Sequence, residues 1–112
     1  MNLHDMPSAE ELVEAVREWL ERDVIAGTTG RLQFHARVAV NVLAMVEREL
    51  RLGGDQAVAH AGRLEQLGCA DDAELAQRIR SGELDGRLEE VRAVVWADVR
   101  DKLAVANPKY LD

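Results

Sequence analysis

Apolar residues recur every three or four positions along almost the whole chain, and this spacing is the strongest constraint on its fold. No stretch alternates apolar and polar residues over the five or so positions that a half-buried strand needs, and no Asn-Gly or Asp-Gly pair separates two β-branched runs. The pattern therefore predicts an all-α fold without a sheet. We expect a single-domain bundle of about five helices, three long and two short, over residues 1–112.

Capping residues and helix-breaking residues predict where each helix begins and ends. Ser8 and Glu11 form a capping-box pattern at the start of the first helix, and Gly53-Gly54 is expected to end the second. Asp55 is expected to cap the third helix, and Asn107-Pro108 to stop the last. The expected helices cover residues 8–26, about 31–52, 55–68, 71–82 and 84–107.

The second predicted helix has an apolar arc over about half of its circumference, which predicts a central position with neighbours on several sides. Residues 8–26 hold two arginines against six acidic residues, a net charge of −4, whereas residues 31–51 hold four arginines against two glutamates, a net charge of +2. Because a short turn joins the two segments, we expect an antiparallel pair whose register the opposite charges favour.

Charge and cysteine content exclude several classes of protein. The 112 residues include 14 basic and 21 acidic side chains, and a net charge of −7 argues against binding to nucleic acid. The N-terminus shows neither a basic nor an apolar leader segment, and the longest apolar-rich run, residues 38–46, is too short to span a bilayer. Cys69 stands alone, which excludes an internal disulfide and is typical of an inert, reduced thiol. We expect a cytoplasmic protein without a membrane-spanning segment.

One local cluster of polar residues is a candidate binding site. Arg37, Asn41 and Arg48 lie on one edge of the second predicted helix, because intervals of four and seven residues return to the same face. Two guanidinium groups beside an amide suit a carboxylate, a phosphate or an acidic helix. The cluster is interpreted either as pairing with the acidic first helix or as a face for an anion or a partner.

Three further polar residues fall on apolar stripes and form a possible buried polar site. His35 and Glu49 lie within the apolar arc of the second predicted helix, and His60 lies on the stripe of the third. A buried carboxylate needs a partner, for which Arg63 and Arg92 are candidates. Each residue is interpreted either as a structural group with an ordinary polar partner or as an acid, base or ligand. For Glu49, simple exposure where the helix leaves the core is a further interpretation.

The two tryptophans differ in their expected positions. Trp19 falls on the inward stripe of the first helix and is predicted to lie in the core. Trp96 lies off the main stripe of the last helix, so it either covers a second helix or serves as an exposed interface anchor. No motif for phosphate binding, zinc proteolysis, nucleophilic hydrolysis or kinase chemistry is present, nor is a paired metal-ligand spacing. The sequence predicts no cofactor and no metal, and favours a binding or accessory protein over an enzyme.

Residues 30–50 and 107–111, with the opening segments 7–12 and 15–20, resemble a family of small uncharacterised all-helical bacterial proteins. Members of that family are often encoded beside an aminoglycoside-phosphotransferase-like kinase and an acyl-CoA dehydrogenase, so the resemblance implies an accessory role in acyl-CoA or related catabolism. It makes His35, Arg37, Asn41, Arg48 and Glu49 the natural site residues without giving any of them a role.

Two hypotheses follow for the function. In the first, the chain is a non-enzymatic interaction protein that forms a homodimer or docks on the kinase-like or dehydrogenase-like protein, through the Arg37, Asn41 and Arg48 face or around Trp96. In the second, it binds an anionic metabolite such as an acyl-CoA, with arginine holding the acid group and His35 or Glu49 handling a proton. The second hypothesis requires a pocket in which these groups converge.

Overall fold

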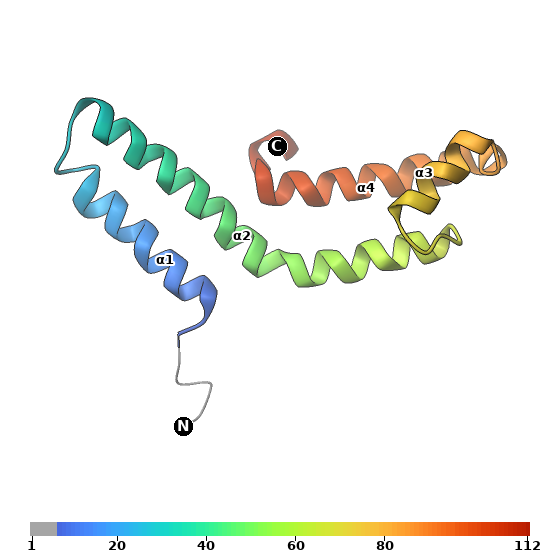
Figure 1. Ribbon diagram of the computed structural model, residues 1–112, viewed down its shortest axis with the longest axis horizontal. Coiled ribbons are helices and arrows are strands. Elements are labelled where there is room, and N and C mark those ends of the chain that lie inside the picture. Colours follow the sequence, from blue (N-terminus) through green and yellow to red (C-terminus); the bar gives the residue numbers. More distant parts are fainter. Residues whose placement is uncertain (1–6) are drawn as a thin grey trace, which may run out of the picture. The chain divides into compact units, whose positions relative to one another are not determined.

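The computed structural model describes residues 7–112, so the expectation of no leader segment at the N-terminus falls on residues outside the described part. The described residues contain helices and no strand, which confirms the all-α prediction. They form four α-helices rather than about five (Figure 1). These are α1 (Ala9–Trp19), α2 (Gly30–Gln66), α3 (Asp72–Ser81) and α4 (Leu88–Ala106).

The predicted break at Gly53-Gly54 is wrong, because α2 continues through both glycines and Asp55 caps nothing. Neither glycine adopts a positive φ, so the backbone stays helical. Two glycines inside a helix cost roughly 1 kcal/mol each relative to alanine, and packing of the helix outweighs that cost. The helix ends instead at Gln66, just before Gly68, whose φ of +72° lets Cys69 N–H reach the Leu64 carbonyl at 2.8 Å in a Schellman motif.

The chain divides into two compact units, an N-terminal unit, Met1–Gly53, and a C-terminal unit, Gly54–Asp112. Helix α2 contributes to both. The expectation of a single domain over residues 1–112 stays a prediction.

In the N-terminal unit, α1 begins as predicted and ends earlier. The capping box is present: the Ser8 hydroxyl accepts the Glu11 N–H at 3.1 Å, and the Glu11 carboxylate accepts the Ser8 N–H at 3.3 Å. The α-helix stops at Trp19 and continues as a π-helical turn, Leu20–Val24, in which Ile25 N–H bonds to the Leu20 carbonyl at 2.9 Å.

The predicted antiparallel pairing of α1 with the first part of α2 is confirmed. Arg17 of α1 forms an ion pair with Glu47 of α2. Glu10, at the start of α1, lies 3.9 Å from Arg51 of α2. At the opposite end, the Gln33 amide donates to the carbonyls of Ile25 and Thr28, both at 3.0 Å, and so ties the connecting loop to α2. These contacts fix the register of the helical hairpin from one end to the other.

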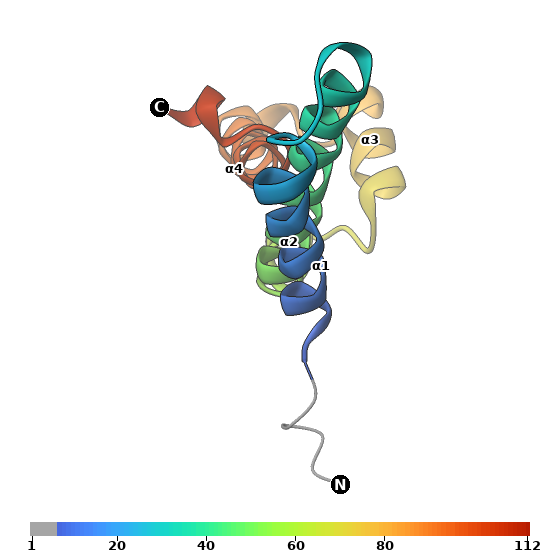
Figure 2. The same cartoon turned by 90° about the vertical axis from the view of Figure 1, so that its left-hand side faces the viewer.

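The C-terminal unit holds most of the core. Helices α3 and α4 lie beside the second part of α2 (Figures 1 and 2), and Leu67 is the most deeply buried large side chain. Asp71 caps α3 by accepting the Glu74 N–H at 2.8 Å, and Gly82, with φ +87°, ends it. The buried cluster of this unit contains Leu64, Leu67, Cys69, Leu75, Leu84, Val91 and Val94.

Helix α4 begins later than predicted and ends where predicted. A 3-10 turn, Asp85–Arg87, precedes its first residue, Leu88. The helix stops at Ala106, directly before Asn107-Pro108, and a second 3-10 turn, Pro108–Leu111, follows. None of the described helices has the length and apolarity needed to cross a bilayer.

Candidate functional site

The structure brings two of the three predicted binding residues together. Arg37 and Asn41 are exposed on α2 and line the same open depression of about 480 Å³, with Glu21 on its opposite wall. Arg48 is half-buried, is engaged in an interaction of its own and does not line this depression. Glu21 belongs to the π-helical turn that follows α1, and the choice between pairing with the acidic segment and a face for an anion or a partner stays a prediction.

His35 and Glu49 are both exposed, so the possible buried site is wrong for His35, and for Glu49 the structure agrees with the interpretation of simple exposure. The reason is that Ala36 and Glu47, not these residues, occupy the side of α2 that α1 covers. His35 accepts a weak hydrogen bond from Arg31 Nε at 3.4 Å and stacks edge-on against Phe34, with ring centroids 5.6 Å apart. Arg63 and Arg92, the partners considered for Glu49, pair elsewhere.

His60 is the predicted site residue with the most developed polar surroundings. Its Nδ1 lies 3.0 Å from Asp98 of α4, and its Nε2 lies 2.8 Å from Asp72 at the start of α3. Arg63, one turn further along α2, bonds to Asp98 at 2.7 Å and to Asp101 at 2.9 Å. The half-buried His60 therefore joins all three helices of the C-terminal unit through ion pairs.

The protonated form of His60 fits this arrangement best. Only the imidazolium can donate from both ring nitrogens, and two carboxylates face it. The hydrogen bond to Asp98 raises the pKa of His60, the charges of Asp98 and Asp72 raise it further, and burial opposes them. Its contacts with Asp72 and Asp98 link α2 to α3 and α4, so its position suits the bracing of these helices.

We expect the stability of the protein to fall as the pH rises through the pKa of folded His60. Because this pKa lies above its unfolded value of about 6.5, the native state binds more protons than the unfolded state between the two values. The stabilisation is complete below about pH 6.5 and is lost above the folded pKa. Urea unfolding between about pH 6 and 9 measures how the free energy of unfolding changes with pH. Arg63, which also faces Asp98, keeps its charge throughout this range and does not contribute to the change. A His60→Gln variant that retained the full slope would contradict the assignment.

Sequence reasoning missed the buried ion pair of the N-terminal unit. Glu47 is the one charged residue in the described part that is buried, and it accepts from Arg17 Nε and, at 3.2 Å, from Arg17 Nη2. Arg17 also bonds to Glu21 at 2.6 Å, and the hydrogen bonds to Glu47 and Glu21 raise the pKa of Arg17. The charge pattern predicted contacts between the two helices but not this one, in which α1 supplies the base and α2 the acid.

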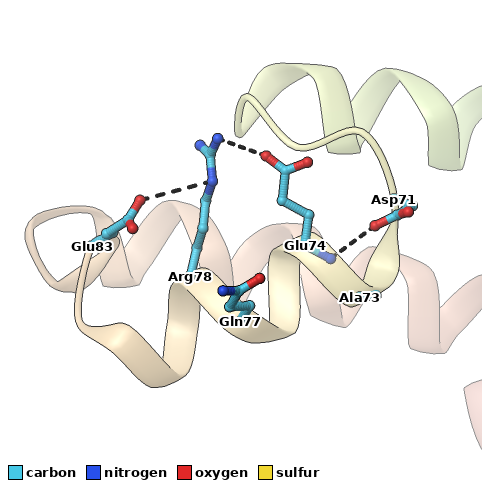
Figure 3. Close-up of a pocket in the computed structure, with 6 residues that line it drawn as sticks. All are labelled: Asp71, Ala73, Glu74, Gln77, Arg78 and Glu83. Atoms are coloured by element: carbon cyan, nitrogen blue, oxygen red, sulfur yellow. Dashed lines mark hydrogen bonds and ion pairs between the residues drawn. The ribbon is translucent and has the colours of Figure 1, made fainter.

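A second open depression, of about 500 Å³, lies on α3 and is strongly polar. Figure 3 shows Arg78 between Glu74, at 2.6 Å, and Glu83, at 3.8 Å. Because both carboxylates engage the only basic group that lines this depression, it offers no free positive charge to an anionic ligand. Across residues 7–112, no group of three or more acidic, histidine or cysteine side chains has the geometry to hold a metal ion.

Both tryptophans are exposed. The prediction that Trp19 lies in the core is wrong: 53% of its surface is accessible, because α1 turns a different side toward α2. Trp96 on α4 is 55% exposed, which matches the position expected for an interface anchor but does not test that role. Cys69 is buried in the core, with its Sγ 3.7 Å from the Leu67 carbonyl, as expected for an inert thiol.

A family model matches residues 26–110, from the loop before α2 to the turn after α4. The chain belongs to the DUF6285 family. The description of DUF6285 is a domain of unknown function, so membership supports the resemblance to an uncharacterised family and leaves the implied gene neighbours as a prediction. No curated protein and no solved structure matches the chain.

Proposed function

We propose that this DUF6285 protein is an interaction protein that docks on another protein through an apolar surface of its N-terminal unit. The observation that supports the proposal is an imbalance between buried and exposed apolar residues. Among the described residues of this unit, Ala36 is the one buried apolar residue, whereas ten large apolar side chains are at least 38% exposed. These ten residues, called the N-terminal apolar surface below, are Leu12, Val16, Trp19, Leu32, Phe34, Val38, Val42, Met45, Val46 and Leu50.

We expect another protein to cover an exposed apolar surface of this kind. Soluble proteins rarely leave large contiguous apolar patches in water, and such patches commonly mark protein interfaces. Trp19 and Phe34 are the aromatic members, and large aromatic side chains often dominate the energy of an interface. A helical hairpin without a core of its own gains most of its stability when this surface is covered.

The net charge of the chain favours a protein as the partner. The net charge of −7 opposes association with nucleic acid and with anionic lipid surfaces. The candidate partners are a second copy of the chain and the two proteins that the family resemblance implies, the kinase-like protein and the acyl-CoA-dehydrogenase-like protein. Of these, the first is developed in the next subsection.

Binding of an anionic metabolite such as an acyl-CoA has less support. The depression at Arg37 and Asn41 is open, and the Glu21 carboxylate on its wall would repel an anion. His35 and Glu49, the groups considered for proton transfer, do not line it. The groups that this hypothesis requires therefore do not converge in one pocket of the described structure.

The two exposed tryptophans, Trp19 and Trp96, provide a matched test of the N-terminal apolar surface. We expect Trp19→Ser to weaken binding to the kinase-like or the dehydrogenase-like protein, whichever is the partner, by about tenfold or more, as for truncation of an interface anchor, and the equally exposed Trp96→Ser to have little effect. Binding is measured by interferometry on immobilised wild-type chain, kinase-like protein and dehydrogenase-like protein. The proposal is wrong if none of the three binds, or if only Trp96→Ser weakens binding.

A further inference from the structure

Six residues on the first part of α2 follow the alternating spacing of four and three that forms the seam of a coiled coil. All six are exposed, and they lie on the side of α2 opposite to Ala36 and Glu47, which face α1. We call this set the α2 seam: Arg31, His35, Val38, Val42, Met45 and Glu49. A seam with this spacing fits a second helix of similar length.

The order of residues along the α2 seam is self-complementary. Arg31 and Glu49 lie at its two ends, each nine residues from the level of Val40. A twofold axis at that level places Arg31 of each copy opposite Glu49 of the other, and Val38 opposite Val42. A parallel arrangement would instead put arginine against arginine and glutamate against glutamate, which costs free energy.

The centre and the ends of the α2 seam have the composition of an interface. Val38, Val42 and Met45 form an apolar centre, and the charged residues lie at the rim, where water can still reach them. The same register places His35 opposite Met45 of the second copy. His35 and Glu49, which are polar residues on an otherwise apolar stripe, thus gain a role as contacts rather than as buried acid or base.

The apolar area near the α2 seam supplies most of what a stable dimer needs. Val38, Val42 and Met45 belong to the seam, and Phe34 and Val46 flank it. At about 150–250 Å² per fully exposed side chain, the accessible fractions of these five residues give on the order of 400 Å². A standard interface buries about 800 Å² on each partner, of which roughly two thirds is apolar in homodimers.

We propose that a second copy of this chain covers the α2 seam, with the two α2 helices antiparallel about a twofold axis at the level of Val40. The inference rests on the proposed function, because it names the partner that covers part of the N-terminal apolar surface. Each copy then keeps its own α1 on the far side of α2, which makes α2 the central helix of the assembly.

Sedimentation equilibrium on the wild-type protein and five variants tests the arrangement. The wild-type chain is expected at twice its mass of 12.4 kDa. Glu49→Arg or Arg31→Glu alone should raise the dimer dissociation constant about tenfold or more, because each creates two like-charge contacts, and the double variant should restore most of the affinity. Val42→Glu should abolish the dimer, whereas Val58→Glu, at a more exposed valine of the same helix outside the seam, should not.

The outcomes separate this inference from the proposed function. A wild-type monomer that still binds the kinase-like or dehydrogenase-like protein through Trp19 overturns the dimer and keeps the docking surface. A dimer that responds to Trp19→Ser but not to Val42→Glu or to charge exchange overturns the α2 seam and keeps self-association. A monomer that binds neither protein overturns both. Circular dichroism confirms that each variant remains helical, as expected for substitutions of exposed residues.

Discussion

Replacing Arg17 by leucine should lower the free energy of unfolding by about 2–3 kcal/mol, because it leaves the buried Glu47 carboxylate without its charged partner. Replacing both Arg17 and Glu47 by leucine should bring the stability back to within about 1 kcal/mol of the wild type, since no charge then remains buried. Urea unfolding of the two single variants and the double variant gives the coupling between the residues.

The control for this cycle is Arg22→Leu. Arg22 also pairs with a glutamate, Glu18, but at 3.4 Å and with 73% of its side chain accessible, so its loss should change stability by less than about 1 kcal/mol. If Arg17→Leu had no larger effect than Arg22→Leu, the ion pair with Glu47 would not hold α1 on α2. The comparison thus measures how much burial adds to an ion pair in this hairpin.

Truncating Leu67 to alanine should lower the free energy of unfolding by about 3–4 kcal/mol. Leu67 is 1% exposed and lies in the main core cluster, so the substitution removes buried methyl groups and leaves a cavity. Denaturant unfolding followed by circular dichroism measures the loss. Leu88→Ala is the matched control: Leu88 is 51% exposed, and we expect a loss of about 1 kcal/mol or less.

A similar loss at Leu67 and Leu88 would mean that Leu88 is covered in solution, and the apolar surface of α4 would then belong to an interface. A small loss at both positions would contradict the core of the C-terminal unit as described. The pair therefore tests the internal packing of this unit independently of any partner.

Local signals in the sequence predicted the helix type and most helix ends. Ser8 with Glu11 and Asn107-Pro108 act on backbone groups a few residues away, so their effect can be read without knowing the fold. The short turn between residues 8–26 and 31–51 likewise predicted the antiparallel hairpin.

Structural features that depend on contacts between distant residues could not be predicted in the same way. Whether Gly53-Gly54 ends a helix depends on packing further along α2. In the sequence alone, a glycine pair inside a helix cannot be distinguished from one that ends a helix. The surroundings of His60 combine residues from α2, α3 and α4, and no spacing along the chain shows that Asp72 and Asp98 meet at one ring. Periodicity found the stripe that holds His35 and Glu49, but not which side of α2 faces α1.

The unequal distribution of the core between the two units has a consequence for the order of folding. Nearly all the buried apolar residues belong to the C-terminal unit, so we expect the folding nucleus there. Starting a new helix is far slower than lengthening one that exists. Once Leu64 and Leu67 have packed, α2 can therefore grow toward Gly30 by elongation alone, and α1 is the last helix to find its place.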